Sequence, residues 1–369
     1  MTIYIVQVVL ILLMGVLLKP SVDLKGRKWF LLLSFVLLAS ISGIRGYSVG
    51  ADTKVYVNLY ENIDSIRLMD GRFETGFIIY LNVLHRIMSN PRFLLLVSSM
   101  ISIGTVTLFT YYYSKEPTIS ILLYVLLGQY FSQMNTMRQA LALSITLLAF
   151  MINLSNKEKF RFPVFRYVIS GLLLIVAIGF HSSSYVAFIP WLLMINHGEK
   201  EELTNLKIRI VIFRTFFIAV VLFVTYSLIM RITMAVLPVY SAYFQSTWSD
   251  SNYFASLLKS LISMVFLICG AAILRKRRLT NLQRFSAIML GLCIAFQVLS
   301  MRMEIWGRVV GFFEIYSFLL WIPEFLSELH LINNKRIIEG GIIGFSFLYM
   351  IIVLTYRPEW TMVVPYVIG

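Results

Sequence analysis

The chain has 369 residues, of which 59% are apolar and only 14% are charged. Soluble domains average about 45–50% apolar and about 25% charged residues, so this composition excludes an ordinary soluble domain and indicates a polytopic membrane protein. The net charge of +14 does not indicate nucleic-acid binding, because the basic residues lie in short segments between apolar stretches, where they orient membrane proteins. Cys269 and Cys293 both lie in apolar stretches, so we expect neither a disulfide nor a metal site.

Apolar stretches recur along the whole chain, and most are close to the length that crosses a bilayer, while residues 184–196 are shorter and could stop part-way. We predict about 12 transmembrane helices, since a spanning helix needs about 20 apolar residues. Residues 2–18 have no basic segment before them and no small-residue cleavage site after them, so we expect a retained span there. Because the stretches follow one another closely, we expect a single all-α domain over residues 1–369. The predicted spans are 2–18, 29–44, 93–113, 118–134, 138–154, 167–181, 184–196, 210–231, 254–274, 285–301, 307–322 and 337–355.

Clusters of lysine and arginine orient these spans. They lie after the first stretch and near 155–166, 200–209, 275–284 and 335–336. The positive-inside rule assigns such connections to the cytoplasm. The assignments agree with one another if both termini lie outside.

A polar loop, residues 45–75, follows the second span and is predicted to lie outside. It begins with Arg45 and ends with Glu74, and it includes Asp52 and Tyr56. Charged residues beside a membrane span are costly and usually serve a site. We therefore expect binding or chemistry at the outer membrane surface.

Residues 76–90 are apolar but contain His85 and Arg86 and end at Asn90-Pro91. A full crossing here would reverse the orientation of the spans on one side of it. We therefore predict a re-entrant or interfacial helix, which is tolerated where protein or water covers the irregular backbone.

Arg138 and Gln139 begin the predicted span 138–154 at its outer end. An arginine near a helix N-terminus is unfavourable for the helix dipole, so it does not serve helix stability. A guanidinium there can bind a phosphate or carboxylate through two parallel hydrogen bonds. The alternative is an interfacial arginine that extends to the lipid headgroups.

Three further residues could transfer protons at the same predicted depth. Asp52 and Glu74 are the carboxylates best placed to deprotonate a sugar hydroxyl, although a loop carboxylate is more often solvated or paired with Arg45 or Lys54. His181, at the outer end of the span 167–181, could act as a general base near neutral pH. A lone histidine at a helix end more often bonds local carbonyls. We expect no zinc site, because no second histidine lies at metal-ligand spacing.

Arg308, Phe312 and Tyr316 are spaced i, i+4 and i+8, so they share one face of a predicted helix. This spacing would direct a guanidinium with aromatic neighbours into the bundle. The alternative is that Glu304 and Arg308 form an i, i+4 pair that stabilises the helix end.

Short motifs recur in order across most of the chain, and together they resemble the EpsG-like membrane proteins of exopolysaccharide, capsule and O-antigen clusters. Ala51 stands where that family often has threonine, a change to another small residue. The motifs are Arg45…Val49-Gly50-Ala51-Asp52-Thr53…Tyr56, Glu74-Thr75-Gly76-Phe77, Met137-Arg138-Gln139-Ala140-Leu141-Ala142, Phe180-His181-Ser182-Ser183 and Arg308…Tyr316.

The resemblance implies a Wzy-type polysaccharide polymerase of the bacterial cytoplasmic membrane, with a helical bundle that could be GT-C-like. Such a glycosyltransferase joins undecaprenyl-pyrophosphate-linked repeat units on the outer face, and pyrophosphate lipid is the leaving group. The expected partners are that lipid-linked oligosaccharide, membrane lipids, a flippase and a chain-length regulator, with no cofactor, metal or nucleic acid.

The resemblance and the predicted depth together suggest roles for the site residues. Arg138 and Arg308, supported by Arg45, would stabilise the charge that develops on the pyrophosphate. Asp52 is the first choice for the base that deprotonates the acceptor hydroxyl, followed by Glu74 or His181. The expected substrate-binding residues are Arg45, Tyr56, Arg138, Gln139, Arg308 and Tyr316.

Two other functions remain open at this point. An O-antigen ligase uses similar donor chemistry, but a large charged outer loop in the later half would favour it, and here the charged loop is early. A flippase or transporter would place ionisable residues along a path through the membrane. Here they concentrate at one face, with Glu314 as the exception.

Overall fold

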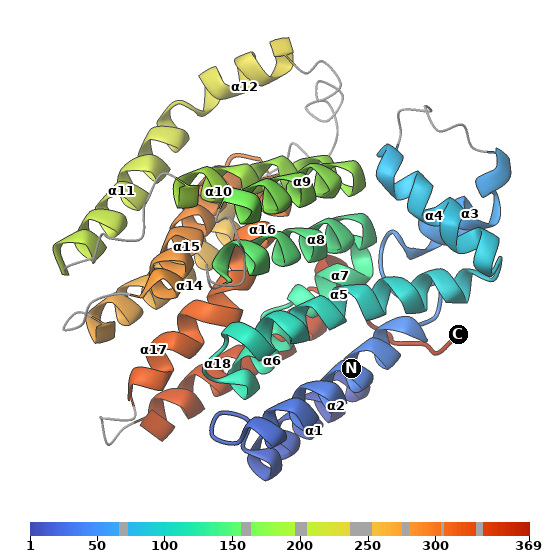
Figure 1. Ribbon diagram of the computed structural model, residues 1–369, viewed down its shortest axis with the longest axis horizontal. Helices are drawn as coiled ribbons and strands as arrows, with labels where there is room; N and C mark the ends of the chain where they lie inside the picture. The colour runs from blue at the N-terminus through green and yellow to red at the C-terminus, as the bar shows by residue number, and fades with distance from the viewer. Residues whose placement is uncertain are drawn as a thin grey trace. The chain divides into compact units, whose positions relative to one another are not determined.

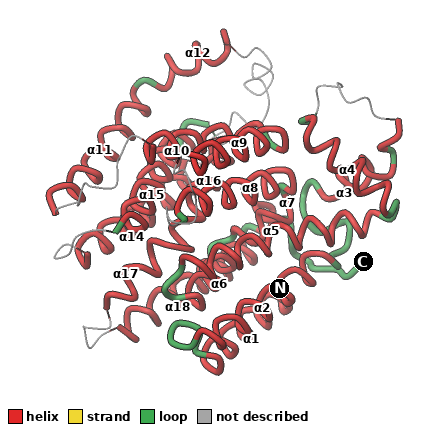
Figure 2. The backbone as a smooth tube through the Cα atoms, viewed as in Figure 1, coloured by secondary structure: helices red, strands yellow, loops and turns green. Residues whose placement is uncertain are grey.

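The computed structural model describes residues 1–65, 73–155, 164–195, 205–236, 253–274, 280–303, 306–329 and 335–369. Within these ranges the chain consists of helices joined by short loops, as Figures 1 and 2 show. The one β contact in the described chain is an isolated antiparallel bridge between Arg45 and Ile368. The prediction of an all-α protein is confirmed.

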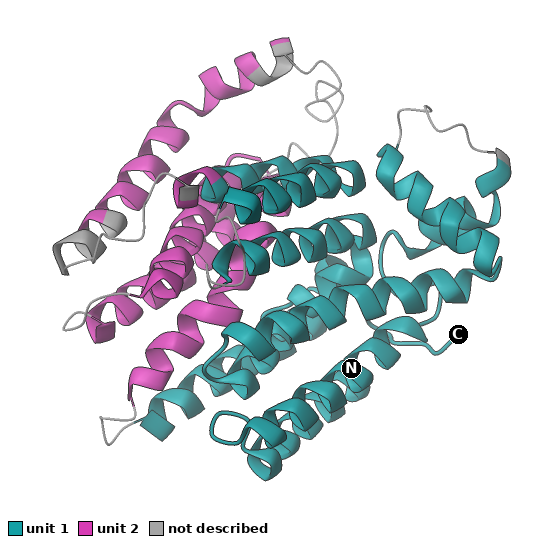
Figure 3. Ribbon diagram, viewed as in Figure 1, with its two compact units in different colours: residues 1–191, 332–369 teal, residues 192–331 magenta. Residues whose placement is uncertain are grey.

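The chain divides into two compact units, coloured separately in Figure 3. The first unit combines residues 1–191 with residues 332–369, and the second comprises residues 192–331. Helix α10, Phe188–Ile195, lies at the division between them. The helices of a single membrane bundle can also pack in two groups. The prediction of one domain therefore stays a prediction.

The first unit contains the long helices of the N-terminal half and the last helices of the chain. Its helices are α1 Thr2–Leu18, α2 Leu24–Gly43, α3 Thr53–Glu61, α4 Thr75–Ile87, α5 Pro91–Tyr113, α6 Pro117–Leu126, α7 Gln129–Asn135, α8 Met137–Leu154, α9 Val164–Phe180, α18 Lys335–Tyr356 and α19 Pro358–Thr361. Short 3₁₀ turns follow α3 at Ile63–Ser65 and α9 at Ser182–Ala187.

In its described residues, the second unit is built from six α-helices, two of which form a bent pair. Its helices are α11 Asn205–Val224, α12 Tyr226–Val236, α14 Tyr253–Ile273, α15 Asn281–Ser300, α16 Trp306–Tyr316 and α17 Ile322–Glu328, the last two joined by a π-helical turn at Ser317–Trp321. A capping box at Thr280 and Gln283 begins α15, which satisfies two backbone N–H groups that a helix start leaves open.

Among the described helices, six are long and apolar enough to cross a membrane, or seven if a bent pair counts as one span. Four further apolar helices are shorter, including α1 and α9. This establishes a multi-pass helical membrane protein. The twelve predicted stretches all fall on helices, but the number twelve is not established.

Two predicted spans differ from the structure in a specific way. The stretch 118–134 is broken at Gly128, whose φ of 92° lies in the left-handed region that favours glycine, and α6 and α7 lie on either side. The stretch 210–231 is bent by 66° between α11 and α12. Hydropathy does not reveal such breaks, because the apolar character continues across them.

Residues 76–90, predicted as re-entrant or interfacial, form most of α4. This helix has 13 residues, about 20 Å at 1.5 Å per residue, which is too short for the roughly 30 Å hydrocarbon core. Ile79, Val83 and Ile87 share one exposed apolar face of it. The structure is therefore compatible with an interfacial position.

The core around α3 and α4 positions the polar residues of interest. Figure 1 shows α3 and α4 at one end of α5 and α8 within the first unit. Tyr56, Phe77, Leu81 and Met137 belong to one buried apolar cluster, together with residues at the start of α5. Burial of their apolar faces in this cluster stabilises α3 and α4, which are too short to be stable alone.

Candidate functional site

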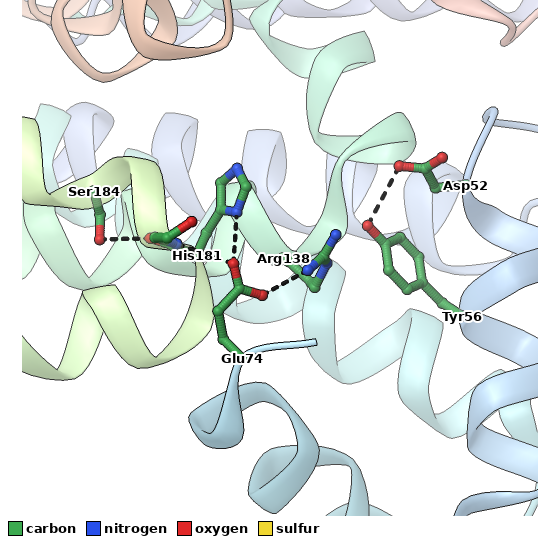
Figure 4. A network of polar contacts seen from close by, with 7 residues as sticks. Asp52, Tyr56, Glu74, Arg138, His181 and Ser184 are labelled. Atoms are coloured by element: carbon green, nitrogen blue, oxygen red, sulfur yellow. Dashed lines mark hydrogen bonds and ion pairs between the residues drawn. The ribbon is translucent and has the colours of Figure 1, made fainter. Parts of the chain in front are cut away.

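Glu74 accepts hydrogen bonds from two motifs that are distant in the sequence (Figure 4). Arg138 donates from Nη1 to Glu74 Oε2 at 2.5 Å. His181 contacts the other oxygen, Oε1, through Nδ1 at 3.2 Å, and the backbone N–H of Ser182 donates to the same oxygen at 3.0 Å. Both oxygens of the carboxylate are therefore engaged.

The helix ends explain how these residues meet. Glu74 precedes the first residue of α4, Arg138 lies in the first turn of α8, and His181 directly follows α9. Helices α4 and α9 approach so closely that a Cβ on Gly76 would meet the carbonyl oxygen of Gly179 at 2.6 Å. Only glycine fits there, and this contact brings Glu74 within reach of His181.

The carboxyl of Glu74 is strongly biased toward its ionised form. Burial alone would raise its pKa, but the hydrogen bond from His181, the charge of Arg138 and the N–H of Ser182 together lower the pKa from 4.5 to about 2. Glu74 is 19% exposed at the side chain, so it is partly shielded from water. At neutral pH it is a carboxylate held by three donors.

An ionised carboxylate can only accept hydrogen bonds, so Nδ1 of His181 carries a proton. In the neutral imidazole the other nitrogen, Nε2, is then the acceptor. His181 is only 8% exposed. Nε2 is buried and has no hydrogen-bond partner among the residues that the structure describes.

The guanidinium of Arg138 also contacts an aromatic ring. It lies over the ring of Phe73, 4.9 Å from the ring centre, at a distance typical of a cation–π contact. Its Nε is buried and unpartnered within the described part of the chain. Arg138 is thus ion-paired but keeps donor capacity. Gln139, the next residue on α8, is half-buried.

Asp52 and Tyr56 continue this row of polar groups on the other side of Arg138 (Figure 4). The Tyr56 hydroxyl donates to Asp52 Oδ2 at 3.4 Å. Burial raises the pKa of Tyr56, while the charge of Arg138 acts in the opposite direction. The phenol therefore keeps its proton, and Asp52 is half-buried beside it.

Arg45 has a different environment. It is 1% exposed, and its guanidinium donates to the backbone carbonyls of Ser42 and of Met134, the latter at 3.3 Å. Burial lowers the pKa of Arg45 to about 10, which leaves it charged at neutral pH. The contacts of Arg45 in the structure are with the protein backbone. Its role in binding pyrophosphate stays a prediction.

The loop after Arg45 contacts the residue that follows α19 and the last residue of α7, two residues before α8 begins. Gly50 has a φ of 95° and donates from its backbone N–H to Met362 at 2.7 Å. The backbone N–H of Ala51 donates to Asn135 Oδ1 at 3.1 Å. The first motif therefore holds the segment just before the helix that carries Arg138, a role that its composition did not reveal.

Arg308 and Tyr316 belong to the second unit, and the structure describes them there. Arg308 is half-buried in the first turn of α16. Tyr316 is fully buried and packs edge-to-face on Phe285 with ring centres 5.2 Å apart. This packing places Tyr316 in the core of its unit, and its predicted contact with substrate stays a prediction. The alternative partner Glu304 lies outside the described residues.

Sequence reasoning found Asp52, Tyr56, Glu74, Arg138 and His181, which the structure brings together in the first unit. It did not find their pairing, or the contributions of Phe73 and of the Ser182 backbone. In the described part of the chain, no three His, Cys, Asp or Glu side chains lie together in a way that could hold a metal ion.

Comparison with known proteins gives one match. The model of a family described as the EpsG family matches residues 28–368. No curated protein matches the chain, and no solved structure matches it.

Proposed function

Since this chain belongs to the EpsG family, we propose that it is a polysaccharide polymerase that joins undecaprenyl-pyrophosphate-linked oligosaccharide repeat units. The observation that supports this function is the cluster of Glu74, Arg138 and His181. It combines a cation with proton-transferring groups at the ends of apolar helices. A lipid-linked donor requires chemistry at such a place, next to the bilayer.

The reaction transfers the growing glycan from its lipid pyrophosphate to a hydroxyl of the next repeat unit. Negative charge develops on the pyrophosphate as the glycosidic bond breaks, and fixed donors that face this charge lower the barrier. Arg138 keeps N–H groups that Glu74 does not occupy. We assign these groups to the pyrophosphate, and the role of Arg308 there remains a separate prediction from the sequence.

The membrane setting is part of the same proposal. We place both termini and the residues 45–75 outside the bacterial cytoplasmic membrane, with twelve spans and a GT-C-like bundle. A flippase and a chain-length regulator would act as partners. The positive-inside pattern of the loops supports this orientation.

The test is polymerisation by the purified protein in liposomes that contain its lipid-linked repeat unit, followed on a gel that resolves glycan length. We expect a ladder that grows by one repeat per step. Arg138→Ala should lower the rate by about 100-fold or more, because a donor to the developing charge is lost.

The matched control is Arg86→Ala, which removes an exposed arginine at the end of α4 and should leave the ladder unchanged. A ladder that survives Arg138→Ala would remove that residue from the site. If folded wild-type protein forms no ladder but moves the lipid-linked unit across the bilayer, the protein is a transporter. A single transfer to another acceptor would indicate a ligase.

A further inference from the structure

The site contains two carboxylates, Asp52 and Glu74, and one imidazole, His181. These three groups are not equally suited to act as a general base. Glu74 has both oxygens occupied by donors, from Arg138, His181 and Ser182. These donors favour its ionised form, so it binds a proton weakly. A general base works best when its pKa lies near the working pH, and Glu74 does not meet this requirement.

Asp52 is also less suited than its motif suggests. Its carboxylate accepts from Tyr56, and in Figure 4 it lies beyond Tyr56 and Arg138 from the Glu74–His181 pair. It is half-buried at the start of α3.

A general base needs a nitrogen with a lone pair, a fixed orientation and no competing partner, and among the described residues Nε2 of His181 has all three. Glu74 accepts from its Nδ1, which assigns the proton to that nitrogen and the lone pair to Nε2. Figure 4 shows Nε2 pointing away from Glu74. This nitrogen is buried without a partner in the described chain, and such an atom in a folded protein calls for a ligand or a catalytic role.

We propose that His181 is the general base that takes the proton of the acceptor hydroxyl on Nε2, and that Glu74 is a positioning residue that holds the histidine in the required tautomer. This inference rests on the proposed polymerase function and assigns the roles within its site. Glu74 also stabilises the imidazolium that forms, as the carboxylate does in other carboxylate–histidine pairs.

The step balances as follows. The acceptor O–H bond breaks, its proton passes to Nε2, and the oxygen forms a new bond to the anomeric carbon of the donor. The bond from that carbon to the pyrophosphate oxygen breaks, and its electron pair leaves with the lipid pyrophosphate. The imidazolium then releases its proton to water, and Glu74 remains ionised throughout.

Charged and phenolic groups lie on the elements around His181. Glu74, at the start of α4, contacts the imidazole, Arg138 of α8 contacts Glu74, and Tyr80 of α4 packs on Phe180. Asp52 and Tyr56 of α3 pair with each other, and Tyr185 of the 3₁₀ turn is exposed. Glu74 makes the direct contact, while Arg138 offsets part of its charge. Glu74→Gln removes that charge and leaves a single acceptor oxygen where the carboxylate has two.

The experiment measures the pH dependence of the ladder's initial rate with the full-length protein in liposomes. Glu74→Gln should move the acid limb to lower pH, because the negative charge beside the imidazole is lost. His181→Ala should lower kcat by about 10²- to 10⁴-fold, with little change in KM for the donor. Added imidazole should partly restore the rate of His181→Ala.

His85→Ala is the matched control, because His85 packs on Tyr60 outside the site and should leave the rate, the acid limb and the response to imidazole unchanged. The inference is overturned if Glu74→Gln leaves the acid limb in place, or if His181→Ala keeps most of the wild-type kcat. It is also overturned if Asp52→Asn alone abolishes transfer. A wild-type protein that forms no ladder would instead refute the polymerase function.

Discussion

Glu74 shows why the chemistry of this site depends on contacts between distant residues. Its partners Arg138 and His181 are 64 and 107 residues away along the chain. Each residue could be recognised by itself as an unusual charge near a predicted span. The pairing changes their roles, because an arginine bound to a carboxylate and a carboxylate bound to a histidine no longer act as isolated groups.

Arg45 provides a test at the scale of the residue. We expect Arg45→Ala to destabilise the protein by about 1–3 kcal/mol, because the carbonyls of Ser42 and Met134 lose the hydrogen bonds that the buried guanidinium donates. The KM of the Arg45→Ala variant for the lipid-linked donor should change less than about threefold, because the guanidinium contacts the protein backbone. Melting in detergent and the ladder assay would measure the two effects.

Arg86→Ala is the comparison, because Arg86 is exposed and its loss should change stability by no more than about 0.5 kcal/mol. A normal melting midpoint for Arg45→Ala with a tenfold higher donor KM would contradict the structural role. It would support the pyrophosphate contact that the family resemblance implies.

At the scale of the element, the crossing of α4 and α9 positions the site. Gly76 has no room for a side chain, since a Cβ would lie 2.6 Å from the carbonyl oxygen of Gly179. A backbone atom cannot move aside as a flexible side chain can. The absence of a side chain at Gly76 therefore sets the distance between the carboxylate of Glu74 and the imidazole of His181.

We expect Gly76→Ala to push α4 away from α9 and to lower the polymerisation rate by about 10- to 100-fold, as misplaced catalytic groups do. Gly179→Ala is the matched control, since its Cβ would meet Gly76 at an ordinary 3.6 Å. The rate and its pH dependence would be measured for both variants. If both variants lost the same fraction of the polymerisation rate, any added methyl group at the crossing would be harmful. The close contact at Gly76 would then have no specific role.

At the scale of the whole molecule, the orientation in the membrane remains the main prediction. Lys54, in the outer polar loop, and Lys28, in the first basic connection, are both exposed. We expect Lys54→Cys to react with an impermeant maleimide from outside intact cells. Lys28→Cys should react only after the membrane is opened, because the positive-inside rule places it in the cytoplasm.

The labelling would be done with Cys269 and Cys293 replaced by serine, so that each variant has one thiol. The serine-only protein is the control and should remain unlabelled. Labelling of Lys28→Cys from outside, with protection of Lys54→Cys, would reverse the topology and move the site to the cytoplasmic face.

Membrane class, helix positions and family follow from the amino-acid order, because hydropathy is a local property of about 20 residues and motifs are read one segment at a time. The breaks at Gly128 and between α11 and α12 do not follow, since local hydropathy is unchanged across them. The base and its positioning residue also required the fold. A hydrogen bond from His181 to Glu74 exists only because two helices cross at glycine, and such a crossing is a property of the packed chain.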